Sequence, residues 1–482
     1  MSGVQLFEDE VVPGVLDRMT EAHVGFVRIP LSWRYIEPVN TDPPTYGWSG
    51  VDPVMSALAN RGLVPVPVVF QNAYWASSNG CGAVDLVPVG RFQSFMQAMA
   101  ERYDGDGVSD APGSPVVNHW EIGNEADFDP AHAAGAHDHG SCFGGGAGPA
   151  ADYGRYLRAA YLGVRAANPA ETIIFGGVAY DRLFNRPGYQ PADGAPFDYF
   201  FVRNVLDYLY ASHRTEQGYP FFDWTAIHVY NDFRNEWDGE PPYNQELRGK
   251  INDFRANQLV SAGNYDWRAR PVAITEVGQP SAPADQWTDR NENLQAVYPG
   301  QLMARAKAEA VAYISWFTGQ DHFTGSCSNI YDWLQYGLLR SQTVYERAVA
   351  CGSANPLPDY VVSGPYETKP AHAAYKTAAE QIGQAIFANQ LTPEQTGSTQ
   401  IEAYRFYKPG QGYVIVAFTD TGERLGRRGI APVTTTMNVS ELLLPGWTGR
   451  IAITDYLGNI TFATGSSIPV TIGQEPVYVR PN

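Results

Sequence analysis

The hydrophobic residues in the first part of the chain alternate between helical and strand-like periods. Segments with apolar residues three or four positions apart, such as 12–24 and 90–103, predict amphipathic helices. Short runs rich in Val, Ile and aromatic residues, such as 25–31 and 63–70, predict buried strands. Strands that alternate with helices of this length are typical of parallel β/α units, and eight such units close a barrel.

The predicted elements follow one another in the order that such a barrel requires. Helices are expected at 12–24, 48–61, 90–103, 153–167, 197–213, 243–262, 291–310 and 370–383. Strands are expected at 25–31, 63–70, within 115–125, and at 172–177, 223–230, 270–277 and 311–317. Only Gly3, Val4 and Gln5 remain for the first strand, which is therefore either very short or lost upstream.

The pattern changes beyond residue 383. Short alternating runs separated by Pro-Gly, Asp-Thr-Gly and Leu-Gly-Asn turns predict strands at 401–406, 412–418, 434–439, 450–455 and 477–479. We therefore expect an α/β fold, with a (β/α)8 TIM barrel over 1–383 and an all-β, sandwich-like accessory domain over 384–482. Its expected role is to stabilise the barrel; a carbohydrate-binding role remains open.

Composition and charge narrow the range of partners. The 482 residues carry a formal net charge of −18, which argues against nucleic acid and anionic membrane, since both require a basic surface. No apolar run reaches membrane-spanning length. The 29 Tyr and 11 Trp residues suit sugar recognition, because aromatic rings stack on the C–H faces of pyranoses. An oligosaccharide or polysaccharide partner fits these features, and the oligomeric state is left open.

The four cysteines lie in Gly- and Ser-rich contexts without metal or redox spacing. We predict two disulfides, Cys81 with Cys142 and Cys327 with Cys351, which imply an oxidising compartment. The polar start of the chain is not a signal peptide. Either an export signal has been removed and the protein is secreted or extracytoplasmic, or the protein is cytoplasmic with free thiols.

Two glutamates occupy equivalent places at predicted strand ends. Glu125 follows an aromatic strand and precedes a long loop of Gly, Ala and His, and Glu276 lies near the end of a β-branched strand before Gly and Pro. Two carboxyls that face each other across a cleft are the equipment of glycoside hydrolysis. The alternative is that both are solvated or ion-paired rim residues.

The segment Trp-Glu-Ile-Gly-Asn-Glu at 120–125 resembles the retaining glycoside hydrolases of clan A, most closely family 39, with family 5 and other relatives still open. The resemblance covers about 1–383. It implies that Glu125 is the acid/base and Glu276 the nucleophile in the cleavage of β-linked glycans. A transglycosylase with the same residues and a non-catalytic carbohydrate-binding barrel are the alternatives.

The resemblance also assigns substrate-binding roles at other strand ends. It implies that Arg28 lies beside the nucleophile, that Asn124 binds the sugar 2-hydroxyl, and that His228 lines the cleft. Tyr230 would touch the nucleophile, and Trp316 would form the aromatic floor of the subsite. For each of these residues the alternative is a structural ion pair or core packing. Further rim candidates are Gln71, Asn72, Trp75 and Trp33.

Other polar residues are read as structural. Glu121 lies on the same strand face as Glu125 and is expected deeper in the barrel. His132, His137, Asp138 and His139 match no zinc spacing, so we predict a solvated loop and no metal; a metal-dependent hydrolase would need His137 or His139 as a ligand. No phosphate or cofactor fingerprint is present, so no cofactor is expected. The sequence does not indicate which sugar is cleaved, or whether cleavage is endo- or exo-acting.

Overall fold

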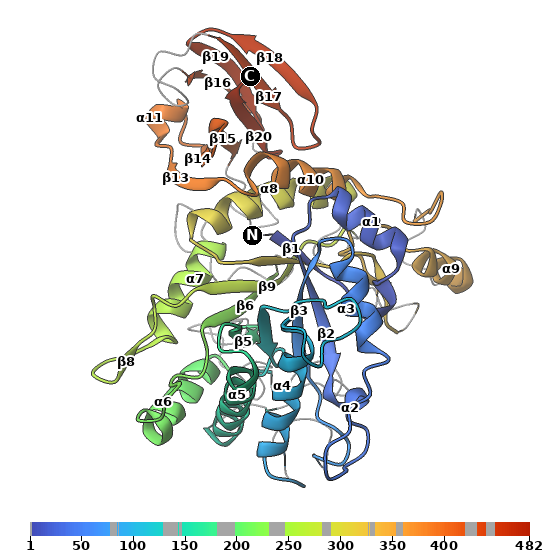
Figure 1. Ribbon diagram of the computed structural model, residues 1–482. Coiled ribbons are helices and arrows are strands. Elements are labelled where there is room, and N and C mark those ends of the chain that lie inside the picture. Colours follow the sequence, from blue (N-terminus) through green and yellow to red (C-terminus); the bar gives the residue numbers. More distant parts are fainter. Residues whose placement is uncertain are drawn as a thin grey trace.

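The computed structural model describes residues 2–77, 84, 86–128, 143, 147–180, 198–230, 246–281, 291–325, 327, 333–352, 360–419, 431–439 and 449–482. These residues form a (β/α)8 barrel followed by a β domain (Figure 1). No described helix has the length and apolar character needed to cross a bilayer.

Eight parallel strands close the barrel in the order β1-β10-β9-β6-β5-β4-β3-β2. Their bounds are β1 (Ser2–Gln5), β2 (Phe26–Ser32), β3 (Val64–Phe70), β4 (His119–Ile122), β5 (Thr172–Val178), β6 (Trp224–Tyr230), β9 (Val272–Gly278) and β10 (Ile314–Phe317). β1 pairs with both β10 and β2, so the short first strand closes the barrel. The predicted barrel is confirmed.

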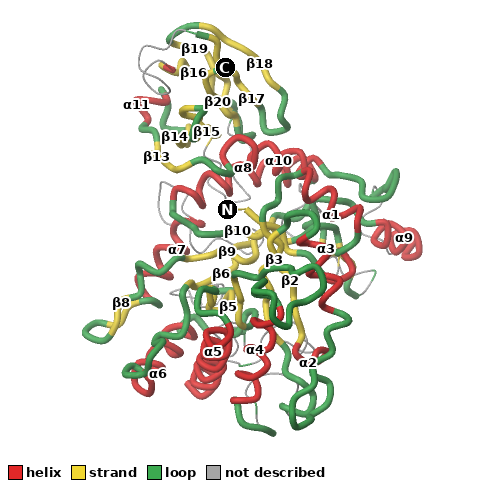
Figure 2. Tube along the Cα trace, in the orientation of Figure 1, coloured by secondary structure: helices red, strands yellow, loops and turns green. Residues whose placement is uncertain are grey.

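Helices surround the strands (Figure 2). Their bounds are α1 (Pro13–Glu21), α3 (Val51–Ala59), α4 (Gly90–Arg102), α5 (Ala147–Ala167), α6 (Phe201–His213), α7 (Glu246–Asn257), α8 (Glu292–Ala308) and α10 (Pro370–Ile382). The hydrophobic pattern did not predict the short elements η1 (Glu8–Glu10), α2 (Trp33–Ile36), α9 (Gln342–Cys351) and α11 (Pro393–Thr396). The helices predicted from periodicity are present, and their ends differ from the predicted ends by several residues.

The barrel interior is filled by small and branched apolar residues towards the strand beginnings. The residues that pack together there are Val66, Ile174, Ala226, Ala273 and Tyr313. Their strand neighbours, such as Ile173 and Ile274, instead join the larger core shared with the helices. This alternation follows from the two-residue period of a strand and makes the strand beginnings a packed core.

The C-terminal domain is built from two antiparallel sheets. The larger sheet has the order β13 (Ile386–Gln390), β14 (Ile401–Lys408), β15 (Gly412–Thr419), β20 (Val477–Pro481), β17 (Arg450–Thr454) and β18 (Ile460–Thr464). The smaller sheet pairs β16 (Val433–Asn438) with β19 (Ser467–Ile472). An apolar cluster between them includes Ile415, Met437 and Ile468. The predicted β-sandwich is confirmed, and β13, β18 and β19 are additions to the predicted strands.

The other face of the larger sheet packs on the barrel. Tyr404, Phe406 and Phe418 belong to the same apolar core as the barrel helices. Beside them, Arg305 of α8 donates to both carboxylate oxygens of Glu402, at 2.9 and 2.8 Å, and both side chains are buried. The contact involves the second half of α8, so the β domain lies towards the strand beginnings, as Figure 1 shows. The two domains therefore share one continuous core.

A small hairpin follows the last barrel strand. It consists of β11 (His322–Phe323) and β12 (Trp333–Leu334). A disulfide joins Cys327, between these strands, to Cys351 at the end of α9. This confirms one of the two predicted bridges, whereas Cys81 and Cys142 lie outside the described residues. Elsewhere, β7 (Val260–Ser261) and β8 (Tyr265–Asp266) form a second short hairpin.

Candidate active site

A cavity of about 460 Å³ opens at the carboxyl ends of the barrel strands. Its polar lining includes Gln5, Arg28, Asn124, Glu125, Glu276 and His322, and its aromatic lining includes Phe7, Phe70 and Phe317. Barrel enzymes place their active sites at this end. A few converging polar groups among aromatic walls are also typical of a small-molecule site.

Glu125 and Glu276 meet in this cavity. Carboxylate oxygens of the two residues and a ring nitrogen of His228 all lie within 4.8 Å of one another. The turn after β4 brings Glu125 into place: Gly123 and Glu125 have φ values of 79° and 45°. For a glutamate this left-handed backbone is uncommon, and such conformations cluster at functional sites. The Glu125 amide donates to the Gly177 carbonyl at 2.6 Å, which fixes the turn.

Arg28 of β2 ties the carboxylates to the barrel interior. Its Nε donates to Glu121 at 2.7 Å and one terminal nitrogen donates to the second oxygen of Glu121 at 3.0 Å. The other terminal nitrogen donates to Glu276 at 2.7 Å and to Gln5. A contact of 2.5 Å to Asn124 Oδ1 uses the remaining N–H. Since a guanidinium has five N–H groups, none is left for a ligand.

Arg28 lies beside Glu276, as the resemblance implies. All five donors of the guanidinium serve protein groups, so Arg28 acts by positioning Glu276 and Asn124. Glu121 is fully buried and accepts from Arg28 and from the Gly177 amide at 2.9 Å. Its geometry is that of the deep structural carboxylate expected from the sequence.

The surroundings of Glu276 favour its ionised form. Burial alone would raise the pKa of Glu276, but the positive charges of His228 and Arg28 and hydrogen bonds from Tyr230 and Arg28 outweigh burial, so its pKa lies below the usual range. Tyr230 Oη donates to Glu276 Oε2 at 2.6 Å, and Arg28 occupies Oε1. Both oxygens are held, so the carboxylate has a fixed orientation towards the cavity.

His228 lies between the two glutamates. Its Nδ1 is 2.9 Å from Glu125 Oε1 and 3.6 Å from Glu276 Oε2. Burial lowers the pKa of His228, but the charges of Glu276 and Glu125 outweigh burial and raise it overall. The strand β5 makes room for the ring, since a Cβ at Gly177 would lie 2.3 Å from His228 Nε2 and 2.3 Å from Thr275 Oγ1.

Asn124 also faces the cavity. Its Oδ1 accepts from Arg28, so its amide nitrogen is the group that remains for a ligand. The structure thus brings together Arg28, Asn124, Glu125, His228, Tyr230 and Glu276. These six residues come from β2, β6, β9 and the turn after β4, segments that are far apart in the sequence.

Other sequence candidates lie away from the described cavity lining. Trp316 is 1% exposed, and its Nε1 donates to the Tyr336 carbonyl at 2.9 Å. Asn72 is buried and accepts from Tyr156. Trp75 is partly buried and donates to the Glu37 carbonyl at 2.8 Å. The structure does not bring these three residues to Glu125 and Glu276.

Two remaining rim candidates are also outside the described lining. Gln71 is partly buried and has a φ of 56° directly after β3. Trp33 is fully buried, and its Nε1 donates to Glu37 Oε2 at 2.7 Å. Trp33 also stacks on Phe95 of α4, so it belongs to the core between β2 and that helix.

The sequence reasoning missed Phe317, Phe7, Gln5 and His322, which do line the cavity. For Phe317 the two-residue period would have sufficed, because Tyr313 fills the barrel interior and every second residue of β10 faces the same way. Trp316, one position earlier, faces the helices. No periodicity marks Phe7 or His322, which lie beyond the strands.

The triad Glu125, His228 and Glu276 has a spacing that could hold a cation. The positive guanidinium of Arg28 and the hydroxyl of Tyr230 already occupy the two Glu276 oxygens, and a cation beside Arg28 would be repelled. The donor set therefore does not fit a resident metal. The alternative ligands His137 and His139 lie outside the described residues.

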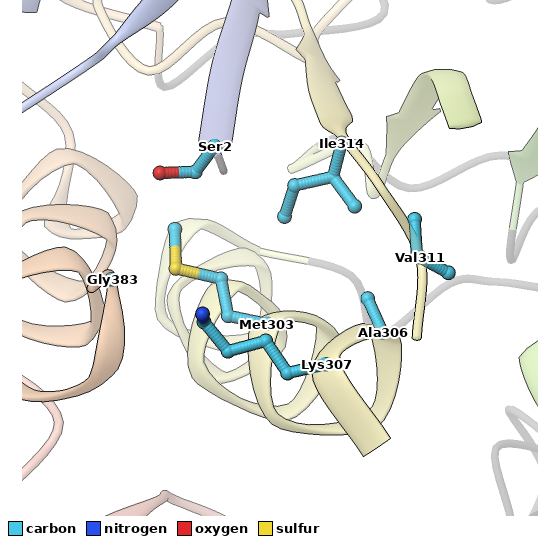
Figure 3. Close-up of a pocket in the computed structure, with 7 residues that line it drawn as sticks. All are labelled: Ser2, Met303, Ala306, Lys307, Val311, Ile314 and Gly383. Carbon is cyan, nitrogen blue, oxygen red and sulfur yellow. The ribbon is translucent and has the colours of Figure 1, made fainter. Parts of the chain in front are cut away.

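A second hollow lies at the opposite end of the barrel (Figure 3). Met303, Lys307, Val311 and Ile314 surround it, and its volume is about 10 Å³. Lys307 donates to the Ala385 carbonyl at 2.9 Å. The hollow is a packing defect between α8, β10 and the domain junction, too small for a sugar.

Comparison with known proteins adds a likeness of fold. No protein-family model and no curated protein matches the chain. A family 39 glycoside hydrolase from the gut symbiont Bacteroides cellulosilyticus has a TM-score of 0.61 at 16% identity, covering 100% of this chain and 80% of its own. A glucosidase from Croceicoccus marinus has a TM-score of 0.59 at 14% identity, covering 100% and 95%.

A GH51 arabinofuranosidase from Xanthomonas axonopodis pv. citri is also similar, with a TM-score of 0.55 at 12% identity over 97% of this chain and 89% of its own. The structural neighbours include glycoside hydrolases of families 39, 51 and 5, so the resemblance to clan A is confirmed in the fold. At these identities the likeness establishes the fold, and the chemistry must be argued from the site.

Proposed function

We propose that this chain is a retaining glycoside hydrolase that cleaves β-linked oligosaccharides or polysaccharides. The observation that carries the proposal is the approach of Glu125 and Glu276, whose oxygens come within 4.8 Å at the floor of an open cavity. Carboxyls about 5 to 5.5 Å apart support double displacement, whereas inverting enzymes keep them about 6.5 to 9.5 Å apart. Glycosidases among the structural neighbours support the same reading.

Glu276 is the nucleophile. Its depressed pKa keeps it ionised, and Arg28 and Tyr230 hold its oxygens so that it can attack the anomeric carbon. The bond to the leaving oxygen breaks as the Glu276–carbon bond forms. Asn124 offers its amide nitrogen to a sugar hydroxyl, a contact that strengthens in the transition state.

Glu125 is the acid/base. Its side chain is 25% exposed against 10% for Glu276, so it can exchange protons with water. It protonates the leaving oxygen in the first step and deprotonates water in the second, and water then releases the sugar with retained configuration. His228 Nδ1 at 2.9 Å orients the Glu125 carboxyl and can share its proton.

The test is to trap the intermediate. We expect a 2-deoxy-2-fluoro aryl β-glycoside to inactivate the enzyme and to add the mass of the fluorosugar to the peptide containing Glu276. Glu125→Ala should lose most activity on substrates with poor leaving groups, because the first step lacks its acid. On substrates with activated aryl leaving groups azide should restore turnover, because the anion attacks the glycosyl-enzyme without base assistance and releases a glycosyl azide. The exposed Glu346 provides the matched control, and Glu346→Gln should behave as wild type. A label on another residue would contradict the assignment of the nucleophile.

Two alternatives use the same geometry. A transglycosylase would transfer the sugar from Glu276 to an acceptor hydroxyl, and product analysis separates it from a hydrolase. A non-catalytic carbohydrate-binding protein would retain affinity in Glu276→Ala and would show no turnover in the wild type. The Arg28–Glu276–Tyr230 arrangement favours catalysis, since a binding site has no need of a fixed, ionised carboxylate.

We further propose that 1–383 form the catalytic barrel, that 384–482 form its accessory domain, and that the protein acts outside the cytoplasm. The Cys327–Cys351 disulfide is compatible with that location. Thiol titration of the protein isolated from its native compartment tests the location. Two reactive thiols from this pair would place the protein in a reducing environment.

A further inference from the structure

The cavity has a wall opposite the acid/base. In the closed barrel, β10 lies four strands from β4 in either direction, so the segment after β10 faces the turn that carries Glu125. The acid protonates the leaving oxygen, and the leaving group therefore departs on the Glu125 side. The glycone, the sugar that becomes attached to Glu276, then lies towards the β10 wall.

His322 is the polar ring on this wall. It begins β11, five residues after the end of β10, and lines the cavity together with Asp9 and Thr324. Its ring packs edge-on against Phe7, with centroids 4.9 Å apart. Its Nε2 lies 3.4 Å from Glu10 Oε2, an ion-pair distance, and is buried without a well-aligned hydrogen bond. Nε2 is thus turned towards Glu10, which leaves Nδ1 as the ring atom that a ligand can engage.

Glu10 holds the ring in this orientation. The side chain is buried, and its oxygens accept from the Phe7 amide at 2.7 Å, Thr318 Oγ1 at 3.1 Å and the Gln320 amide at 2.5 Å. The carboxylate thus joins η1 to the segment after β10. A residue so fully engaged has no capacity to bind sugar itself, but it fixes the place of His322.

We propose that His322 is a specificity-determining residue that hydrogen-bonds a hydroxyl of a neutral glycone, with Glu10 as its positioning residue. The inference rests on the proposed function and names the substrate class. The described cavity lining carries three carboxyl groups, Asp9, Glu125 and Glu276, and two basic groups, Arg28 and His322. Arg28 has no free donor and His322 is paired with Glu10, so neither offers a free cation to a uronate carboxylate, whereas a hydroxyl can hydrogen-bond His322.

The experiment compares aryl β-glycosides that differ by one hydroxyl. The glycoside that turns over fastest in a panel is chosen as the parent compound. Analogues of it are then made that each lack one hydroxyl of the glycone, and kcat/KM is measured for the parent and for each analogue. Wild type should lose about 10- to 100-fold on one deoxy position, since a site built to bind a hydroxyl rejects the analogue that lacks it. In His322→Ala that loss should fall to about twofold, while the losses at the other positions stay as in wild type.

Three further variants control the interpretation of this experiment. Glu10→Gln should weaken discrimination at the same position, and His23→Ala, which removes a surface histidine paired with Glu380, should leave the profile unchanged. Conservative His322→Gln should restore part of the discrimination if His322→Ala folds poorly. A deoxy profile in His322→Ala identical to wild type, or faster turnover of the corresponding aryl glucuronide, overturns this inference alone. Absence of turnover by wild type on every glycoside removes the proposed function, and this inference with it.

Discussion

The two ends of the barrel differ in the side chains that fill its interior: charged groups at one end and apolar groups at the other. At the carboxyl ends, Arg28, Glu121, Glu276 and His228 place charges in the interior and leave an open cavity. At the strand beginnings, Val66, Ala226 and their neighbours fill the interior with apolar side chains. The first arrangement orders charges at a desolvation cost, and the second supplies the packing that offsets it.

Each end also has a buried arginine that is ion-paired with glutamate. Arg28 with Glu121 and Glu276 lies at the cavity, and Arg305 with Glu402 lies where the β domain meets α8. Both pairs are nearly inaccessible to solvent. Their burial is alike, so any difference in their effect on activity must come from position. Substitution of the two arginines therefore separates the effect of a buried ion pair on stability from its effect on activity.

The largest effect is expected for Arg28→Leu. The change leaves Glu121 and Glu276 buried without their counter-charge, which should cost about 3 to 5 kcal/mol of unfolding free energy. Loss of the preorganised donor should also lower kcat on the order of 10²- to 10³-fold. Urea unfolding and steady-state kinetics on the folded fraction measure the two effects. Unchanged kcat per folded molecule would separate Arg28 from the chemistry.

Arg305→Leu should lower stability without lowering activity. It leaves Glu402 buried without its counter-charge, so the unfolding free energy should again fall by about 3 to 5 kcal/mol. The kcat/KM of the folded fraction should stay within about twofold of wild type, because the pair is at the other end of the barrel. The same assays apply. A specific-activity loss comparable with that of Arg28→Leu would show that the two ends are coupled.

Tyr230→Phe should act on the chemistry alone. It removes the hydroxyl that donates to Glu276 Oε2, and a hydrogen bond to a charged group contributes about 1.5 to 3 kcal/mol, or about a 10- to 100-fold loss in kcat. One contribution that depresses the pKa of Glu276 disappears, so that pKa rises. The acid limb of the kcat/KM profile should move to higher pH. An unmoved limb would exclude Glu276 as the group that titrates there.

The smallest expected effect is on the pH dependence of stability and concerns Glu171. This residue directly precedes β5, at the end of the barrel where the strands begin. Burial raises the pKa of Glu171 to about 8, although Trp120 donates to it at 2.6 Å. The folded state then holds a proton that the unfolded state has released. Stability should therefore fall as pH rises from about 4.5 to about 8, by at most about 1.4 kcal/mol per pH unit.

Glu171→Gln tests this expectation, since the amide carries no charge at any pH. Melting temperatures between pH 5 and pH 9 should decline less in the variant than in wild type, while kcat/KM keeps its wild-type pH profile. Parallel declines would remove Glu171 as the source of the pH dependence.

The fold was predictable because the barrel repeats one local pattern. Alternating helical and strand periods placed the barrel strands after β1 and the surrounding helices, and the change of period after 383 predicted the β domain. β13, β18 and β19 escaped prediction. β18 is an exposed edge strand, and exposed edges lack the clear apolar alternation of a half-buried strand.

The site was predictable only where a strand end carries the side chain. Asn124, Glu125, His228, Tyr230 and Glu276 end strands or follow them directly, so barrel topology brings them together. Trp316 was chosen over Phe317 because the resemblance places an aromatic floor at this strand end, whereas alternation along β10 decides for Phe317. His322 and Glu10 could not be foreseen, because their contact joins segments 312 residues apart that no periodicity relates.

The complete engagement of the Arg28 guanidinium has a consequence for anyone wishing to retune this protein. Lysine brings three donors from a single nitrogen and cannot replace a planar fork that serves four side chains. Arg28 should therefore be kept in any engineered variant. The replaceable part is the hairpin after β10, which the Cys327–Cys351 bridge fastens to α9, so libraries aimed at new sugars belong there.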